Sequence, residues 1–240
     1  MSFNPCALIP VYNHSRRLPG IVHRLREMGL YCLLVDDGSS PSHAQVLAAL
    51  AAQDREVVVK THRQNRGKGA AVKTGLAEAF RLGFSHALQI DADGQHDLRD
   101  VGAFLQAARR RPEAVICGQP RFDDSIPKGR YYSRYLTHVW VWINTLSFAI
   151  PDAMCGFRMY PLSQLMPLLE SESMGDRMDF DIEVLVRLSW RDVPMIWLPT
   201  RVRYEGDGIS HFRPFEDNWR ISRMHARLFF TMLLQQFSGR

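Results

Sequence analysis

Short apolar runs alternate with amphipathic segments through the first half of the chain, and this alternation constrains the fold most. The runs are CALIPV (6–11), YCLLVD (31–36), EVVVK (56–60), HALQI (86–90) and EAVICG (113–118). The segments between them, which place apolar side chains at helical spacing, are 15–28, 42–53, 70–83 and 97–110. Near-continuous apolar strands separated by helices predict an α/β fold, with a mainly parallel sheet flanked by helices on both faces.

The alternation weakens in the second half of the chain. There, 130–150 predicts a long apolar helix, 195–205 two late strands (MIWLP and RVRYE) and 215–237 a terminal helix. No repeat, low-complexity tract or linker-like stretch interrupts the 240 residues. Because a chain of this length can bury a large core, we expect a single domain over residues 1–240.

The composition indicates a globular protein, and its net charge is compatible with several kinds of anionic partner. With 46% hydrophobic and 23% charged residues, the chain is typical of a globular protein. Its formal charge of +5 suits an anionic substrate, an anionic membrane surface or nucleic acid. The sequence has no basic stripe with interleaved aromatics, so we expect no nucleic-acid partner. The four widely spaced cysteines predict buried free thiols in a reducing cytosol.

Unusual polar groups follow the first two strands, at the sheet edge where ligands bind in such folds. The first strand ends in PVYNH (10–14), in which Pro10 and Asn13 are turn formers and Tyr12 offers a flat ring. The second ends in VDDGSS (35–40), where Asp36 and Asp37 can accept hydrogen bonds from a ribose hydroxyl or a base N–H. A turn that caps the next helix explains the second pattern equally well.

A glycine-rich basic segment, RQNRGKGAAVKTG (63–75), follows the third strand. Gly67 and Gly69 alternate with Arg66 and Lys68 directly before a predicted helix. Such a loop suits contact with phosphate, because helix N-termini attract anions. It is not a Walker A loop, which has a different spacing, and a solvated basic turn is the alternative.

The fourth strand ends in IDADGQH (90–96), with Asp91 and Asp93 two residues apart. Counting from Asp91 places neither glycine at position 6 nor an acidic residue at position 12, which excludes an EF-hand. Two carboxylates can still hold Mg²⁺ or Mn²⁺ if a substrate diphosphate completes the coordination shell. Gln95 and His96 can orient the carboxylates or add a ligand. The alternative is an ordinary polar turn.

The order of these motifs resembles that of the family 2 glycosyltransferases, which have the Rossmann-like GT-A fold. PVYN, VDDGS, NRGKGAA and DADGQHD match in turn, and DAMCGFRMY (152–160) and MDFDIEVLVRL (178–188) continue the match. The dolichyl- and polyprenyl-phosphate sugar transferase branch is the most similar. The resemblance implies a nucleotide-sugar-binding half over about 1–120, an acceptor-side half over about 121–214, and a C-terminal amphipathic helix over about 215–237.

The resemblance also implies roles for single residues. Asp91 and Asp93 would hold the metal and the donor diphosphate, Gln95 would assist the metal, and Asp93 would serve catalysis directly. The implied nucleotide-sugar contacts are Pro10, Tyr12, Asn13, Asp36, Asp37, Lys68, Asp91 and Ala92. The family inverts the anomeric centre by in-line attack of the acceptor.

On the acceptor side, the resemblance singles out Asp152 as base or acceptor orienter. Asp181 and Glu183 compete for the role of base, or could instead hold Arg158 by a salt bridge. Arg158 and Arg130 are candidates to bind phosphate, because a guanidinium matches its geometry, and a structural surface cation is the alternative for each. Residues 204–220 correspond to a flexible loop that closes over the donor in relatives, with His211 and Arg213 as diphosphate contacts.

The apolar and basic residues of the predicted terminal helix bear on whether the protein contacts a membrane. Ile221, Met224, Leu228 and Met232 recur at helical steps beside Arg220, Arg223 and Arg227, a pattern that suits a membrane interface or packing on the domain. The most apolar stretch, 135–150, is too short to cross a membrane, and no basic segment typical of a signal peptide precedes the first strand. We therefore expect a cytoplasmic protein, peripheral on the inner face of the cytoplasmic membrane, with a lipid or polyprenyl-phosphate acceptor.

The predicted activity is an inverting, metal-dependent transfer of a sugar from a UDP- or GDP-linked donor. A sugar-1-phosphate nucleotidyltransferase is an alternative, although its glycine-rich loop after the first strand is missing from PVYNHSRR. A degenerate protein that only binds nucleotide sugar is the other alternative, and the intact pair of Asp91 and Asp93 argues against it.

Overall fold

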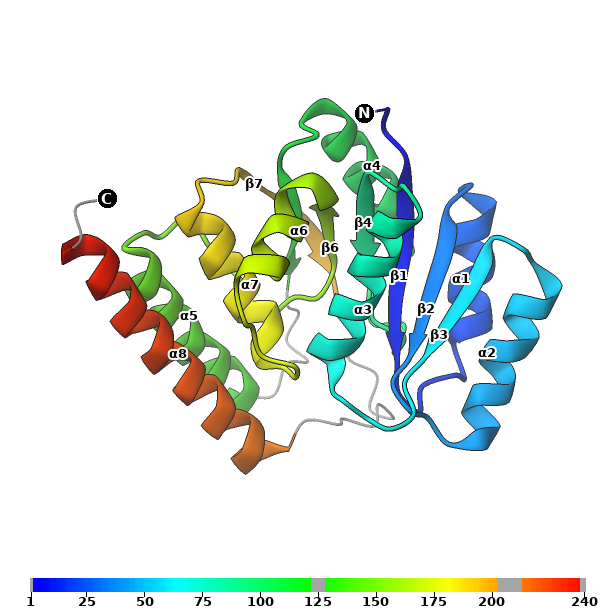
Figure 1. Cartoon of the computed structure of the whole chain (residues 1–240), viewed down its shortest axis with the longest axis horizontal. Helices are drawn as coiled ribbons and strands as arrows, with labels where there is room; N and C mark the ends of the chain where they lie inside the picture. Colours follow the sequence, from blue (N-terminus) through cyan, green and yellow to red (C-terminus); the bar gives the residue numbers. More distant parts are fainter. Residues whose placement is uncertain (1, 122–127, 203–212, 238–240) are drawn as a thin grey trace.

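The computed structural model describes residues 2–121, 128–202 and 213–237, except the side chains of 128–133 and 214. These residues form a seven-stranded sheet in the order β3-β2-β1-β4-β6-β5-β7 (Figure 1). The strands are β1 Pro5–Val11, β2 Tyr31–Asp36, β3 Val57–Thr61, β4 His86–Gln89, β5 Val115–Arg121, β6 Arg158–Pro161 and β7 Met195–Arg201. All neighbours pair in parallel except β6, which is antiparallel to β4 and to β5.

Helices cover both faces of the sheet. They are α1 Leu18–Glu27, α2 Pro41–Gln53, α3 Lys68–Arg81, η1 Leu98–Asp100, α4 Val101–Arg110, α5 Lys128–Thr145, α6 Leu162–Ser171, α7 Asp179–Trp190 and α8 Pro214–Phe237. Helices α5 and α8 lie together at the end of the molecule away from β3 (Figure 1). The predicted α/β fold, with a mainly parallel sheet and helices on both faces, is confirmed.

The core lies on both faces because successive strand residues point in opposite directions. In β1, Leu8 packs with Leu76 of α3 on one face, while the next residue, Ile9, packs with Phe104 of α4 on the other. All four of these side chains are fully buried. Burial of each such side chain stabilises the fold by roughly 1.5–3 kcal/mol. Because helices cover both faces of the sheet, the side chains on both faces of strands such as β1 are buried, which explains the continuous apolar runs of the sequence.

The second half of the chain holds elements that the sequence did not predict. Strand β6 and helices α6 and α7 were missed. Of the two late strands, MIWLP lies in β7; Arg201 of RVRYE ends β7, Val202 forms an isolated bridge with His96, and 203–205 lie outside the described residues. Residues 179–188 of α7 are all buried, including Asp181 and Glu183. A helix that is buried all round shows no amphipathic period, which explains why the pattern failed there.

Two further predictions have clear outcomes. Cys6, Cys32, Cys117 and Cys155 are free and buried, as expected, and burial raises the pKa of each thiol to about 12. The apolar stripe of α8 packs on the domain, which is one of the two predicted alternatives. Ile221, Met224, Leu228 and Met232 are buried against the rest of the molecule, so this stripe cannot contact a membrane.

Candidate active site

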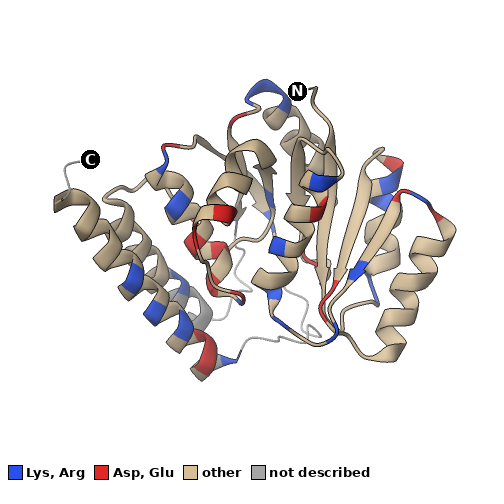
Figure 2. Cartoon of the chain, in the orientation of Figure 1, with Lys and Arg blue, Asp and Glu red and all other residues tan. Residues whose placement is uncertain are grey.

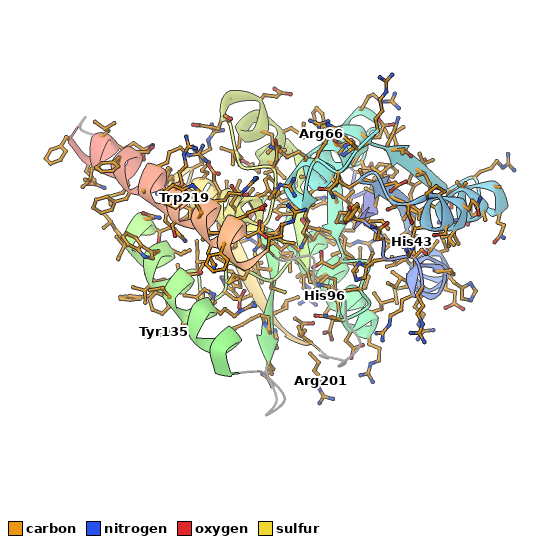
Figure 3. All side chains as sticks on the ribbon, turned by 90° about the horizontal axis from the view of Figure 1, so that it is seen from below. His43, Arg66, His96, Tyr135, Arg201 and Trp219 are labelled. Atoms are coloured by element: carbon orange, nitrogen blue, oxygen red, sulfur yellow. The ribbon has the colours of Figure 1, made fainter. Side chains whose placement is uncertain are left out.

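The carboxyl ends of the parallel strands lie at one edge of the sheet. Val11 of β1 is level with Asp36 of β2, which is level with Thr61 of β3, and the polar residues after these strands meet there. Figure 3 views the molecule from this edge, with Arg66 and His96 on the side of the first strands. The candidate site is built at this edge.

Asp37 organises the glycine-rich loop. Its Oδ1 lies 2.7 Å from His62 Nδ1 and accepts a hydrogen bond from the Arg66 backbone N–H at 2.9 Å. Its Oδ2 accepts from Asn65 Nδ2 at 2.9 Å and from the Gly67 backbone N–H at 2.8 Å. Both oxygens are thus occupied by the protein, and the residue is only 2% exposed. This corrects the prediction that Asp37 contacts the nucleotide, since its carboxylate holds the loop instead.

Asn13 joins the loops that follow β1 and β2. Its backbone N–H donates to Ser39 Oγ at 3.0 Å, and its Oδ1 accepts from the Ser40 N–H at 2.9 Å. The backbone of Asn13 has a φ of 53°, a left-handed conformation that asparagine tolerates. The asparagine side chain therefore has a structural task in addition to the predicted one at the base.

The other residues predicted to bind the base and ribose lie at the same edge. Asp36 is buried, and its Oδ1 accepts from the Ser39 N–H at 2.9 Å. Pro10 is buried near the end of β1, and Tyr12 is half-buried directly after it. The structure therefore brings Pro10, Tyr12, Asn13 and Asp36 together around the ends of β1 and β2.

A turn from the second half of the chain covers the N-terminus of α3. The Ala70 N–H donates to the Asp176 carbonyl at 2.9 Å, and Lys73 Nζ contacts Asp176 Oδ1 at 2.7 Å. Gly67, with a φ of 107°, lies so close that an added Cβ would be 2.4 Å from the Asp176 oxygen. The N–H of Ala70 is thus occupied by protein and is not open to phosphate.

Lys68 joins two carboxylates from distant parts of the chain. Its Nζ lies 2.7 Å from Asp91 Oδ1 and 3.0 Å from Asp181 Oδ2. Gln89, fully buried in β4, donates its Nε2 to Asp181 Oδ1 at 3.1 Å. The first residue of α3, the segment after β4 and the first turn of α7 therefore meet in one charged cluster.

The charges of this cluster control its ionisation. Burial opposes the ionisation of Asp91, but the Lys68 ammonium and the hydrogen bond with His96 outweigh it and hold the pKa of Asp91 well below its usual range. Burial likewise opposes the charge of Lys68, and Asp181 and Asp91 together raise its pKa. For Asp93, burial and then repulsion from Asp91 raise the pKa. A cation placed between Asp91 and Asp93 would relieve this repulsion.

The remaining groups around Asp91 and Asp93 fit a hard divalent cation. Asp91 Oδ1 is buried and, apart from the ion pair with Lys68, has no hydrogen-bond partner among the described residues. Asp93 Oδ1 accepts from the Gln95 N–H at 2.9 Å, while His96 Nε2 lies 3.4 Å from Asp91 Oδ2. Carboxylate oxygens are the ligands that Mg²⁺ and Mn²⁺ prefer. The described residues hold no group of three or more His, Cys, Asp and Glu side chains suited to a metal ion.

Gly156 lies against this charged cluster. An added Cβ would be 2.8 Å from Lys68 Nζ and 2.9 Å from Asp91 Oδ2, closer than real Cβ contacts. The glycine of DAMCGFRMY thus keeps the space beside the carboxylate clear. Ala92, between the two aspartates, is buried among apolar side chains.

Asp152 is bound by the protein on both oxygens. Its Oδ2 accepts from Arg134 of α5, at 2.8 Å from Nε, and His138 Nε2 lies 3.8 Å away. Its Oδ1 accepts from the backbone N–H groups of Met154 and Cys155, both at 2.9 Å. The carboxylate therefore ties α5 to the DAMCGFRMY segment, and these contacts compete with a role as base.

Arg158 has a different place from the predicted one. It is 1% exposed, and its guanidinium donates to Tyr160 Oη and to the carbonyls of Asp181 and Ala153. It therefore cannot bind phosphate in this arrangement, and its contact with Asp181 is to the backbone and not to the carboxylate. Glu183 is fully buried and pairs with Arg187 and Arg227, which excludes it as the catalytic base.

Two predicted contacts fall outside the description. His211 and most of 204–220 lie outside the described residues, and Arg130 is placed only by its backbone in α5. Arg213, at the start of α8, pairs with Glu216 at 3.1 Å.

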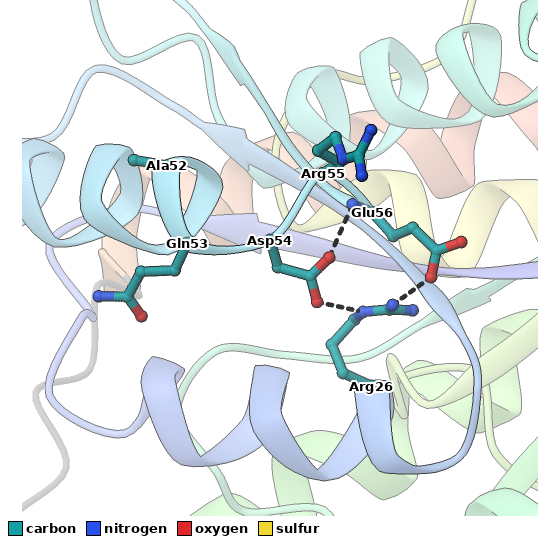
Figure 4. A pocket seen from close by; sticks show the side chains of 6 residues that line it. All are labelled: Arg26, Ala52, Gln53, Asp54, Arg55 and Glu56. Atoms are coloured by element: carbon teal, nitrogen blue, oxygen red, sulfur yellow. Dashed lines mark hydrogen bonds and ion pairs between the residues drawn. The ribbon is translucent and has the colours of Figure 1, made fainter.

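Several residues of the site carried no signal of their role in the sequence. His62, Gln89 and Arg134 lie in none of the acidic or basic motifs, and Asn65 and Gly156 are uncharged members of RQNRGKGAAVKTG and DAMCGFRMY. Each of the five acts on a partner that is distant in sequence. A shallow hollow lies at the opposite edge of the sheet, where Arg26 pairs with Asp54 at 2.7 Å and also with Glu56 (Figure 4). Because these charges already pair with one another, the hollow adds no ligand site.

The family model of glycosyl transferase family 2 matches residues 6–165. The chain belongs to this family. Dolichyl-phosphate beta-glucosyltransferase from Dictyostelium discoideum is 25% identical over 251 residues, covering 95% of this chain and 74% of that protein. Polyprenol monophosphomannose synthase from Mycolicibacterium smegmatis is 32% identical over 167 residues, covering 64% of this chain and 60% of its own length.

A solved structure supports the fold of this family 2 glycosyltransferase. Glucosyl-3-phosphoglycerate synthase from Mycobacterium tuberculosis, in complex with Mn²⁺, UDP and glucosyl-3-phosphoglycerate, has a TM-score of 0.70 at 13% identity. The alignment covers 96% of this chain and 80% of that one. The predicted GT-A fold is confirmed. Within the described residues, no helix has the length and apolarity that crossing a membrane requires.

Proposed function

We propose that this glycosyltransferase moves a sugar from a UDP- or GDP-linked donor to a polyprenyl-phosphate or related lipid-linked acceptor, with inversion at the anomeric carbon. The observation that carries the proposal is the cluster of Lys68, Asp91 and Asp181 beside Asp93. The names of two relatives, a dolichyl-phosphate beta-glucosyltransferase and a polyprenol monophosphomannose synthase, support the acceptor class. The reaction would take place at the inner face of the cytoplasmic membrane.

Asp91 and Asp93 are the residues that would hold Mg²⁺ or Mn²⁺, with Gln95 in support. Two carboxylates leave most of the coordination shell open, so the donor's diphosphate would complete it. When bound, the cation neutralises charge on the departing nucleoside diphosphate. The Mn²⁺ and UDP bound in the mycobacterial structure are consistent with this chemistry.

Lys68 would act on the same diphosphate. Held between Asp91 and Asp181, its ammonium is fixed at the start of α3 and keeps Asp91 ionised. A fixed positive charge beside the leaving group stabilises the charge that develops there without reorganisation. Gly156 supports this arrangement, because it leaves room beside Asp91.

Nucleotide recognition would fall to the ends of β1 and β2. Asp36, Tyr12 and Pro10 would contact base and ribose, and Ala92 would line the site through its backbone. Asn13 and Asp37 act through the loops that they hold, because their side-chain oxygens accept hydrogen bonds from the protein.

The acceptor would approach from the side of α5. A phosphate acceptor is already an anion near neutral pH, so it needs little help from a general base. Asp152 would then orient the acceptor side by fixing Arg134, and Asp181 remains the second candidate for a base. Arg130 and His211 stay proposed phosphate contacts.

Family membership decides against the nucleotidyltransferase alternative. To test the proposal against a protein that only binds nucleotide sugar, the chain is incubated with Mn²⁺, a panel of UDP- and GDP-linked sugars, and either a short polyprenyl phosphate or its dephosphorylated polyprenol. We expect one donor to give a glycolipid with the phosphate and none with the alcohol. Donor binding without product from any pair would establish the binding-only alternative.

A further inference from the structure

Large apolar side chains are exposed along the outer faces of α5 and α8. Phe215 and Trp219 are 93% and 71% exposed at the start of α8, and Phe237 is 86% exposed at its end. Such side chains rarely gather on the surface of a soluble protein unless they contact a partner. The exposed set, here called the docking surface, comprises Leu136, Trp140 and Ile143 of α5 and Phe215, Trp219, Phe230, Leu234 and Phe237 of α8.

Helix α8 is apolar on two opposite faces. Its inner face, with Leu228 fully buried, packs on the molecule, whereas Phe230 and Leu234 point outward and are 64% and 68% exposed. A helix that only packs on its own domain needs one apolar stripe. At about 1.5 Å per residue, the outer stripe from Phe215 to Phe237 extends roughly 33 Å.

Aromatic contacts join the two helices into one surface. Trp140 of α5 stacks on His225 with ring centroids 6.1 Å apart, and it meets Phe229 edge-on at 6.4 Å. Phe229 in turn contacts Phe230, at 5.8 Å. Figure 3 places Tyr135 and Trp219 on these neighbouring helices, apart from Arg66 and His43 on the donor side.

Positive charge lies beside the apolar stripe. Arg220 and Arg223 are exposed and have no ion-pair partner among the described residues, whereas Arg227 pairs with Glu183. The exposed carboxylate of Glu216 on α8 is paired with Arg213. Figure 2 shows the charges of α8 in its N-terminal half, and residues 228–237 carry none.

We infer that the docking surface binds a phospholipid bilayer that contains anionic lipids. Tryptophan and phenylalanine beside arginine are the side chains that such an interface takes up, with each cation attracted by anionic headgroups. A second copy of the chain is a poorer match. The described part of α8 offers no unpaired exposed carboxylate to meet Arg220 and Arg223, so a symmetric pair would leave these cations unmatched.

The docking surface lies near the candidate active site, so a bound membrane could supply the acceptor of the proposed reaction. Only this link to the acceptor rests on the proposed function. Helices α5 and α8 both begin at the edge of the sheet where the candidate site lies (Figure 1). Through Arg134, α5 also contacts Asp152. A bilayer on the docking surface would therefore present a lipid-linked phosphate to the acceptor side of the site.

Flotation of the full chain with vesicles tests the inference. Vesicles of phosphatidylcholine alone are compared with an equal mixture of phosphatidylcholine and phosphatidylglycerol, without donor, metal or acceptor. One variant combines Phe230→Ser with Leu234→Ser, and another combines Arg220→Glu with Arg223→Glu. Matched controls are Phe80→Ser with Leu82→Ser, which are 42% and 38% exposed near the end of α3, and Arg55→Glu with Arg110→Glu.

We expect the parent chain to float with the anionic vesicles, each test variant to bind at least about tenfold more weakly, and the controls to bind as the parent does. A parent that stays at the bottom of the gradient, or test variants that float equally well, would overturn the inference. A parent that sediments as a dimer, does not float and becomes monomeric in the apolar variant would assign the surface to a second copy. Failure of the proposed donor chemistry would leave flotation unchanged.

Discussion

Two carboxylate sites at the same sheet edge differ in their hydrogen-bond partners. Buried Asp37 accepts hydrogen bonds from two backbone N–H groups and from the Asn65 amide, and it also contacts the His62 ring. Among the described residues, the partners of half-buried Asp91 are the ionisable side chains of Lys68 and His96, and its Oδ1 has no hydrogen bond apart from the ion pair with Lys68. Asp93 beside it is destabilised as an anion by Asp91.

The comparison separates a carboxylate that holds a loop of the site from the two carboxylates that we propose bind a ligand. Backbone donors cannot leave Asp37 without loss of the loop, so its replacement should cost stability. Burial and repulsion from Asp91 both oppose the charge of Asp93, and the cation that we propose at this site would offset the repulsion.

Asp93→Asn should have the largest effect on activity. Loss of a metal ligand should lower turnover of the donor by about a thousandfold, while the melting temperature stays the same or rises, because a charge that Asp91 opposes is removed. Steady-state release of the nucleoside diphosphate and thermal denaturation measure the two effects. Asp192→Asn, at an exposed site with a φ of 54°, is the matched control and should change neither. Full activity in Asp93→Asn would remove this residue from the site.

Asp37→Asn, unlike Asp93→Asn, should lower the stability of the fold. The new amide would present N–H groups to the donors of Gly67 or Asn65, so we expect a loss of about 3–5 kcal/mol in the free energy of unfolding. Denaturant titration measures this loss. Asp36→Asn is the control, because Asp36 accepts one described hydrogen bond, from Ser39, and should cost at most about 1.5 kcal/mol. Equal losses for both variants would contradict the scaffold role of Asp37.

Gly156→Ala tests whether the space beside Lys68 and Asp91 is needed for activity. Its methyl group would displace Lys68 or Asp91, so donor turnover should fall by about 10–100-fold with a small change in stability. Gly102→Ala in α4 is the matched control, since an added Cβ there meets no atom within 4 Å. It should keep full activity and gain slightly in stability. Turnover in Gly156→Ala equal to the parent's would show that this space is not needed.

These outcomes bear on how much the sequence could predict. The strands of the first half were predictable from their apolar runs, and Asp91 and Asp93 could be placed at the edge because parallel strands end there. The separate roles of Asp36 and Asp37 were not predictable. The donors that occupy Asp37 come from His62, Asn65 and the loop after them, which only the tertiary fold brings near.

The second half was harder for a related reason. Asp181 meets Lys68 across more than a hundred residues, on a helix buried all round, so neither periodicity nor a local motif marks it. Arg158 looked like a phosphate ligand because arginine often is one, yet burial turns it inward to carbonyl groups. The outer stripe of α8 was hidden by the inner one, which has the more regular spacing.

His225 is a buried ionisable group whose partner, unlike the partners of Asp91, is uncharged. Its Nδ1 contacts the Asn144 amide at 3.1 Å, and burial lowers its pKa from 6.5 to about 4. The unfolded chain therefore binds the proton more readily, so the stability is complete above pH 6.5 and declines as the pH falls toward 4. Between pH 7 and pH 5 this group should lower the free energy of unfolding by about 2 kcal/mol.

Denaturant titrations at both pH values check this prediction with two variants. His225→Gln should reduce the loss of stability at pH 5 by that amount, whereas His23→Gln, on the exposed face of α1, should not. An unchanged pH dependence in His225→Gln would mean that the buried imidazole is not the group that titrates.

Metal-dependent donor binding tests whether Asp91 and Asp93 hold the metal and the donor diphosphate. The melting temperature of the parent chain and of Asp93→Asn is measured with a panel of UDP- and GDP-linked sugars, with and without Mn²⁺. We predict that at least one donor raises the melting temperature of the parent only when Mn²⁺ is present, and that Asp93→Asn loses this shift. A shift that does not depend on Mn²⁺, or that survives in Asp93→Asn, would contradict the assignment of Asp91 and Asp93 to the metal and the donor diphosphate.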